Sequence, residues 1–251
     1  MPAKKKYKAY LLTVDDLEIP VKIYKERRNS IRASLAKDHA ILRLPLFISG
    51  RAEQEQIDRF YFWLKDKVLS KDRFRAKFLP KHYKDGYQFT LGDRLFTLKM
   101  IESTNKSHSG KYLGNNEIQI KLALGASIKE SESAITNLIS RVIAQLYQKP
   151  FAQKVRSINE QCFKQEIKSV KLKYNRSNWG SCSSSSNLNF STRLLFAPEW
   201  VQDYVIIHEL AHLIELNHSE RFWSLVKKVM PDYKKAEKWL KQHGHLCDFG
   251  L

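Results

Sequence analysis

The segment His208–His218, HELAHLIELNH, places three histidines and a glutamate where they could bind a metal ion and activate water. His208 and His212 are four residues apart, so on a helix both imidazoles leave the same face and can bind one ion. Glu209 follows the first ligand, and from there its carboxylate can take a proton from a metal-bound water. Zinc suits this arrangement, because coordination lowers the pKa of its water to about 7. The segment therefore predicts a hydrolytic zinc site with Glu209 as the base.

His218 is the predicted third ligand, and it lies too far along the chain to share a straight helix with His212. The helix must end and the chain must turn back, and Asn217 is the residue best suited to the left-handed conformation that such a turn usually needs. Ser219 can then cap a second helix, which Pro231 ends. Spacing leaves three carboxylates as alternative third ligands, namely Glu215, Glu220 and Asp232.

A helix from Glu199 to about Leu216 is expected to carry the site. Upstream of it, residues 170–174 alternate as a strand and residues 188–196 are strand-like. Residues 187–195 are the candidate strand for pairing with an extended substrate beside the metal.

The segment Trp179-Gly180-Ser181-Cys182 lies between these two strands. We expect Trp179 to pack and Gly180 to form a turn. Cys182 is expected to be an inert small residue, although a fourth ligand or an inhibitory thiolate is an alternative role for it.

The first half of the chain reads as β-rich with one long helix. Residues 17–26 alternate as a strand, and a hairpin is expected around Lys37-Asp38-His39. Ser49 can cap the long helix, and Gly92-Asp93 marks a second hairpin. The polar segment 106–117 is expected to be a mobile loop.

The character changes near residue 126, so we expect a β-rich part over 1–126 and a hydrolase domain over 127–251. A helical stripe runs through Ile135, Leu138, Ile139, Val142 and Leu146. Pro150 is expected to interrupt or kink the continuation of that helix. No internal sequence repeat is visible.

The chain of 251 residues carries a formal net charge of +18, which favours nucleic acid, nucleotides or an acidic protein face as partners. The only true basic run, AKKKYK, is expected to be a loose terminus. The three cysteines, Cys162, Cys182 and Cys247, are odd in number and far apart, so they do not indicate a disulfide framework. Without a signal peptide or a membrane-length apolar run, we expect a cytoplasmic protein that does not enter a membrane.

The segment Trp179–Trp223 closely resembles the YgjP-like metallopeptidase family of bacterial proteins, which is related to the WLM and SprT-like proteases of the zincin clan. Weaker likeness covers nearly the whole chain. The resemblance implies an α+β fold, with a zincin-like catalytic half and a β-rich N-terminal half. In that catalytic half, an active-site helix lies beside a small mixed sheet. It also implies one zinc ion per chain, bound by His208, His212 and His218, with Glu209 as base.

Two departures from related patterns stand out. Metzincins share the histidine spacing but have glycine where this chain has Glu215, and no clear Met-turn follows. Family members often have arginine before Trp-Gly-Ser-Cys, where this chain has Asn178, with Arg176 nearby. No Cys-x-x-Cys ribbon follows, so a dedicated role in DNA damage is not implied.

Further residues are candidates for supporting roles. Phe222 and Trp223 are expected to pack the second helix and hold His218 in place, and Trp179 to support the site. His243 and His245 are better explained by a polar tail than by a second metal pair. The candidates for substrate binding or oxyanion stabilisation are Tyr174, Arg176, Asn189 and Arg193.

The main prediction is a zinc-dependent metallopeptidase that cleaves peptides or proteins. The first alternative keeps the metal and hydrolyses a phosphoanhydride in a nucleoside triphosphate. The second alternative is a basic nucleic-acid-binding protein with structural zinc. Three histidines and an unbound glutamate favour catalysis, because structural zinc sites usually close with four ligands that include cysteine.

Overall fold

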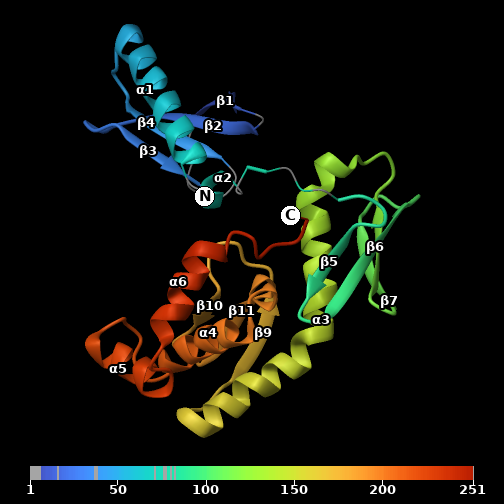
Figure 1. The fold of residues 1–251 in the computed structure, drawn as a ribbon. Coiled ribbons are helices and arrows are strands. Elements are labelled where there is room, and N and C mark those ends of the chain that lie inside the picture. Colours follow the sequence, from blue (N-terminus) through green and yellow to red (C-terminus); the bar gives the residue numbers. More distant parts are fainter. Residues whose placement is uncertain are drawn as a thin grey trace. The chain divides into compact units, whose positions relative to one another are not determined.

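The computed structural model forms two compact units, Met1–Pro80 and Lys81–Leu251 (Figure 1). It describes residues 7–15, 17–36, 39–70, 72–75, 78–79, 81 and 83–250. The predicted boundary near residue 126 falls inside the second unit, because the strands before it and the helix after it share one hydrophobic core. The basic run at Lys4–Lys6 and the turn residues Lys37 and Asp38 lie outside the described residues.

The first unit is a mixed four-stranded sheet with the order β1-β2-β4-β3. The two outer pairs of strands are antiparallel, and the central β2–β4 pair is parallel. Its strands are β1 (Tyr7–Val14), β2 (Leu17–Glu26), β3 (Arg32–Leu35) and β4 (Ala40–Pro45). The predicted strand over 17–26 and the hairpin that follows it are therefore confirmed.

Helix α1 (Gly50–Leu69) follows this sheet, and a short helix α2 (Asp72–Arg75) comes after it. The predicted cap is confirmed, because the Ser49 hydroxyl accepts a hydrogen bond from the Ala52 N–H at 3.4 Å. Phe60, Leu64 and Val68 turn towards the core, where alternate residues of β2 are also buried.

The second unit opens with another four-stranded sheet, in the order β5-β6-β8-β7. Its strands are β5 (Gln88–Leu91), β6 (Arg94–Glu102), β7 (Ser109–Gly114) and β8 (Glu117–Leu122). Two antiparallel hairpins are joined through a parallel pair and followed by a helix, as in the first unit. The chain thus contains a topological repeat although its sequence shows none, because strand order depends on patterning and turns rather than on residue identity.

The prediction of a mobile loop over 106–117 is wrong, because this segment forms β7 and the turn into β8. Asn115 and Asn116 have φ angles of 47° and 60°, the left-handed pair that a tight hairpin turn requires. The Asn116 side-chain oxygen also accepts a hydrogen bond from Arg94 at 2.6 Å, which holds the turn in place.

Helix α3 (Ile128–Cys162) packs on β7, β8 and β9 and buries the predicted apolar stripe, with Leu146 partly buried. The helix continues through Pro150 and changes direction part-way along its length (Figure 1). A proline inside a helix removes one backbone hydrogen bond and crowds the preceding turn, so a bend is the expected response. Of the two predicted outcomes, interruption is wrong.

The site is built on the C-terminal part of the second unit, where a three-stranded sheet has the order β10-β11-β9. Its strands are β9 (Ser169–Lys173), β10 (Gly180–Cys182) and β11 (Asn187–Ser191), followed by the 3-10 helix η1 (Thr192–Phe196). The last three helices are α4 (Glu199–Ala211), α5 (Glu220–Val229) and α6 (Tyr233–His243). Helix α4 beside a small mixed sheet confirms the predicted α+β fold class. Within the described residues, no helix has the length and apolar character needed to cross a membrane.

Gly110 allows α3 to approach β7 closely, since a Cβ atom there would lie 3.1 Å from the Cβ of Leu138. We expect Gly110→Val to lower the free energy of unfolding by about 1–3 kcal/mol through overpacking, as measured by urea denaturation. Lys111→Val in the same strand is the control, and its exposed position predicts a change within about 0.5 kcal/mol. Equal stability of the two variants would contradict this packing.

Candidate metal centre

Helix α4 ends earlier than predicted, at Ala211, with His212 as its last, capping residue. Two tight turns end it, because the N–H groups of Leu213 and Ile214 donate to carbonyls three residues before them. The prediction of a left-handed Asn217 is wrong, since this residue is not among those with positive φ. Its side-chain oxygen instead accepts a hydrogen bond from the Ser219 N–H at 3.0 Å and turns the chain by that contact.

Helix α5 begins where the sequence predicts. The Ser219 hydroxyl caps it by accepting from the Phe222 N–H at 3.3 Å, and the helix ends at Val229, shortly before Pro231. The turn and this cap together bring His218 back towards the end of α4.

The three histidines His208, His212 and His218 lie close enough to bind one ion, with their ligand nitrogens within 4.8 Å of one another. The Nε2 atoms of His208 and His218 are 3.1 Å apart. No other group of three or more His, Cys, Asp or Glu side chains with such an arrangement occurs in the described parts of the chain. The three alternative carboxylates are outside this cluster; Glu215 contacts Arg221 at 3.9 Å and Asp232 contacts Lys235 at 2.6 Å.

His208 and His212 have protonation states that allow their imidazoles to bind a metal ion. His212 Nδ1 lies 3.0 Å from the Glu215 carbonyl oxygen, so Nδ1 carries the proton and Nε2 is left as the ligand atom. Burial, and to a lesser extent the neighbouring His212 and His218, lowers the pKa of His208 to about 4. A neutral imidazole at pH 7 is the form that binds a cation.

Aromatic rings pack around the histidines. Phe222 is fully buried, and its ring centroid lies 4.9, 4.4 and 4.8 Å from those of His208, His212 and His218. Trp223 stacks on His218 at 5.7 Å. These rings restrict the imidazole rotamers without competing for the ligand nitrogens.

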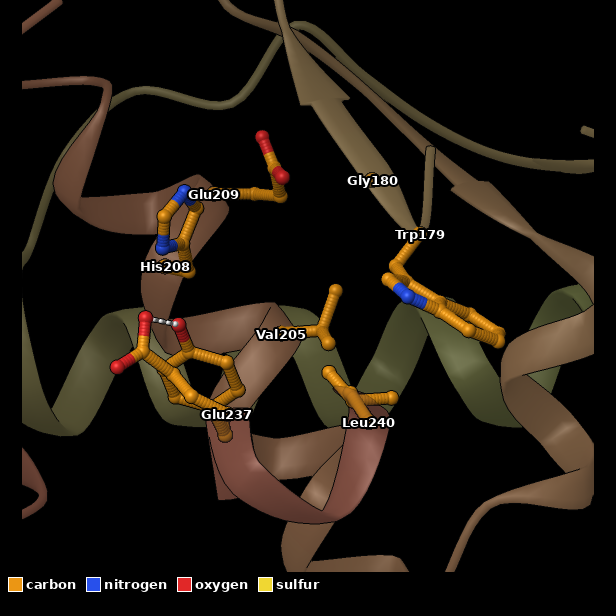
Figure 2. Close-up of a pocket in the computed structure, with 8 residues that line it drawn as sticks. Trp179, Gly180, Val205, His208, Glu209, Glu237 and Leu240 are labelled. Carbon is orange, nitrogen blue, oxygen red and sulfur yellow. Dashed lines mark hydrogen bonds between the residues drawn. The ribbon is translucent and has the colours of Figure 1, made fainter. Parts of the chain in front are cut away.

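Glu209 lies against strand β10 and is only 6% exposed (Figure 2). A Cβ atom on Gly180 would come within 2.5 Å of its Cγ and 2.6 Å of its Oε1. The predicted turn at Gly180 is therefore wrong, because this residue is in a strand and its missing side chain makes room for the carboxylate. Burial raises the pKa of Glu209 to about 8, and a hydrogen bond from the Cys182 backbone N–H acts in the opposite direction. A cation bound by the histidines would also favour the carboxylate form.

Strand β10 is the edge of its sheet and lies beside α4. The predicted substrate-pairing segment 187–195 includes β11, whose two sides are already occupied by β9 and β10. The Ser191 N–H donates to Trp179 and the Ser183 N–H donates to Asn187, so residues 179 and 183 turn their backbone groups towards β11. By strand alternation, the backbones of Gly180 and Cys182 face away from the sheet.

A pocket of about 290 Å³ opens beside Glu209 and His208 (Figure 2). Helix α4 forms one side of it, strand β10 the second and helix α6 the third. Its lining residues are Trp179, Gly180, Tyr204, Val205, His208, Glu209, Glu237 and Leu240. The pocket thus adjoins the first histidine and the glutamate, and no lysine or arginine is among these lining residues.

The four candidate oxyanion residues are not brought together with the histidines. Arg193 is buried and donates to the carbonyls of Arg176, Gly244 and Cys247 at 2.7–2.9 Å. Tyr174 donates to both carboxylate oxygens of Asp248, at 2.8 and 3.0 Å. Asn189 lies in the central strand β11, opposite Ser181 and Lys171, and Arg176 lies in the loop between β9 and β10.

The guanidinium of Arg193 also stacks over the Trp179 ring at 4.6 Å, so Arg193 supports a wall of the pocket. A Cβ atom on Gly244 would lie 2.7 Å from the same indole ring.

Burial raises the pKa of Cys182 to about 11, and therefore its side chain remains a thiol. His243 and His245 do not belong to a metal-ligand cluster of the described residues.

Sequence reasoning missed several of these residues. The sequence predicts a turn at Gly180 and gives no role in the site to Tyr204, Glu237 or Leu240. A glycine next to a buried strand edge is a signal for close approach, but only the structure shows that Glu209 is its neighbour.

Comparison with known families decides the wider assignment: residues 29–243 match a family model described as a YgjP-like metallopeptidase domain. The chain belongs to the YgjP-like metallopeptidase family. The resemblance predicted from Trp179–Trp223 is thereby confirmed. No curated protein sequence matches the chain.

Two solved structures are similar to this YgjP-like protein over part of its length. The metallopeptidase zymogen of Pyrococcus abyssi abylysin is 22% identical with a TM-score of 0.32, covering 41% of this chain and 98% of its own. The metallopeptidase zymogen of Methanocaldococcus jannaschii jannalysin is 19% identical with a TM-score of 0.33, covering 37% of this chain and 94% of its own.

Because Phe222 contacts all three imidazoles, we expect Phe222→Leu to weaken the affinity of the histidine cluster for added zinc about 10–100-fold, if this cluster binds the metal that the family implies. Competition with a chelator at fixed pH would measure this change. Phe151→Leu is the control, since this buried ring packs against Phe190 and contributes to the core rather than to the histidines. Equal zinc affinity in the two variants would contradict a positioning role for Phe222.

Proposed function

We propose that this YgjP-like protein is a zinc metallopeptidase in which His208, His212 and His218 bind zinc and Glu209 acts as general base. The observation that carries the proposal is the convergence of three ligand nitrogens within 4.8 Å beside a buried carboxylate that is not part of the ligand cluster. Three nitrogen ligands leave a tetrahedral ion one open position, as catalytic zinc sites require.

When bound, zinc supplies Lewis acidity that makes water more acidic and polarises a carbonyl group. Glu209 accepts the proton from the attacking water and passes it to the departing amine. Burial against β10 keeps this carboxylate in one place, and the Cys182 N–H fixes its orientation.

The outer edge of β10 offers a site for the substrate main chain. The backbone of Gly180 and the carbonyl of Cys182 face away from the sheet, so an extended peptide can pair with them as an added strand, while the Cys182 N–H stays on Glu209. Such pairing would bring the peptide bond past Glu209 and would recognise main chain rather than sequence.

The two alternative functions gain no support from this site. Phosphates would meet the carboxylates of Glu209 and Glu237 in the adjoining pocket, whose lining includes no cationic side chain. A structural zinc site would be expected to close with a further ligand, and Cys182 is not in the described histidine cluster.

We expect about one zinc per chain by elemental analysis of the purified wild type. His218→Ala should lose the zinc, because two histidines remain, whereas Glu209→Gln should keep it. Glu209→Gln should also lower kcat for peptide hydrolysis about 10²–10⁴-fold through loss of the base. The exposed Glu220→Gln is a control of equal charge change, expected to retain both zinc and activity. Absence of zinc from the wild type, even after zinc is added, would refute the proposal.

We expect Gly180→Ala to retain zinc but to lower kcat by about 10²-fold or more, because the added methyl group displaces the Glu209 carboxylate. Ser181→Ala in the same strand adds no atom and serves as the control. Comparison of zinc content and peptide hydrolysis for the two variants tests the prediction. Full activity in Gly180→Ala would show that the carboxylate does not depend on this contact.

A further inference from the structure

The pocket beside Glu209 combines apolar walls with one acidic group on its α6 side. Trp179, Val205 and Leu240 supply its apolar lining (Figure 2). At about 290 Å³ the pocket is at the lower end of the range for small-molecule sites, so it suits one side chain of a peptide.

Glu237 supplies the acidic group, and one of its oxygens accepts a hydrogen bond from the Tyr204 hydroxyl at 3.1 Å (Figure 2). This contact fixes the carboxylate but does not neutralise it, because a phenol is an uncharged donor. Among the described residues, no lysine or arginine forms an ion pair with Glu237. Lys234, Lys238 and Lys241 of the same helix are exposed to solvent.

We propose that this pocket binds a lysine or arginine side chain of the peptide substrate and that Glu237 determines this preference. The aliphatic stem of such a side chain would lie along Trp179, Val205 and Leu240, and its charged end would meet the free oxygen of Glu237. This inference rests on the proposed peptidase function, because it assigns a substrate class to the same site.

The net charge of +18 acts against the approach of a cationic peptide from a distance. At about 0.15 M salt the screening length is about 8 Å, so the local carboxylate outweighs charges further away. Recognition of a basic side chain is therefore expected at physiological ionic strength, and it should not depend on long-range attraction.

The test uses the zinc-loaded full chain carrying Glu209→Gln, which should bind peptide without cleaving it. The probes are blocked penta-alanine peptides in which one alanine at a time is replaced by lysine or by norleucine, whose stem carries no charge. Binding is followed by tryptophan fluorescence at about 0.15 M salt. Trp179→Phe should abolish the signal if the peptide enters this pocket.

At one peptide position, lysine should bind about tenfold more tightly than norleucine. Adding Glu237→Gln should remove that difference, and the amide oxygen can still accept from Tyr204, so the fold is preserved. Glu220→Gln, an exposed change of equal charge outside the pocket, should leave the difference intact. Equal binding of both peptides, or a lysine preference that survives Glu237→Gln, would overturn the inference.

The wild-type enzyme separates this inference from the proposed function. Cleavage of lysine and norleucine peptides at equal rates would keep the peptidase and refute the role of Glu237. Lysine-selective binding without any cleavage by the zinc-loaded wild type would refute the peptidase and keep the cation-binding pocket.

Discussion

Strand β10 and helix α4 approach each other so closely at Gly180 and Glu209 that not even a methyl group fits between them. The carboxylate is buried by this contact and receives a backbone hydrogen bond from Cys182. A buried carboxylate is costly unless a hydrogen bond or a cation compensates it. A metal ion in the adjacent histidine cluster would be such a cation, so the Glu209 carboxylate and the three imidazoles would stabilise each other's charge.

The position of β10 in turn depends on residues far from the metal cluster. Trp179 leads into the strand and lies under the guanidinium of Arg193. This guanidinium donates to two carbonyls of the C-terminal segment, at Gly244 and Cys247, and to one in the loop before β10, at Arg176. Asp248 accepts from Tyr174 and pairs with Lys81 at 2.9 Å. In this chain of net charge +18, Arg193 and Lys81 hold the C-terminal segment in place, whereas the charged groups that line the pocket are the acidic Glu209 and Glu237.

Sequence predicted what is local and missed what is long-range. His208, His212 and His218 lie within one short segment, together with the helix cap at Ser219. The local sequence therefore predicts the turn that brings the three histidines together. The roles of Gly180 and Arg193 could not be read in this way, since their partners are Glu209 and the 244–247 carbonyls, distant in sequence. The Asn115–Asn116 pair is a local signal for a tight hairpin turn, but the polar residues around it favour the prediction of a loop.

The contacts of Lys81 with Asp248 and Phe249, near the end of the second unit, also affect the order in which the unit can fold. Lys81 donates to the carbonyl of Phe249, 168 residues later in the chain. Such non-local contacts bear a large loop-closure entropy and form slowly, whereas the histidine turn closes over ten residues between His208 and His218. A folding chain can therefore bring His208, His212 and His218 together before the pocket wall beside Glu209 is in place. Under the proposed function, metal binding would then precede activity.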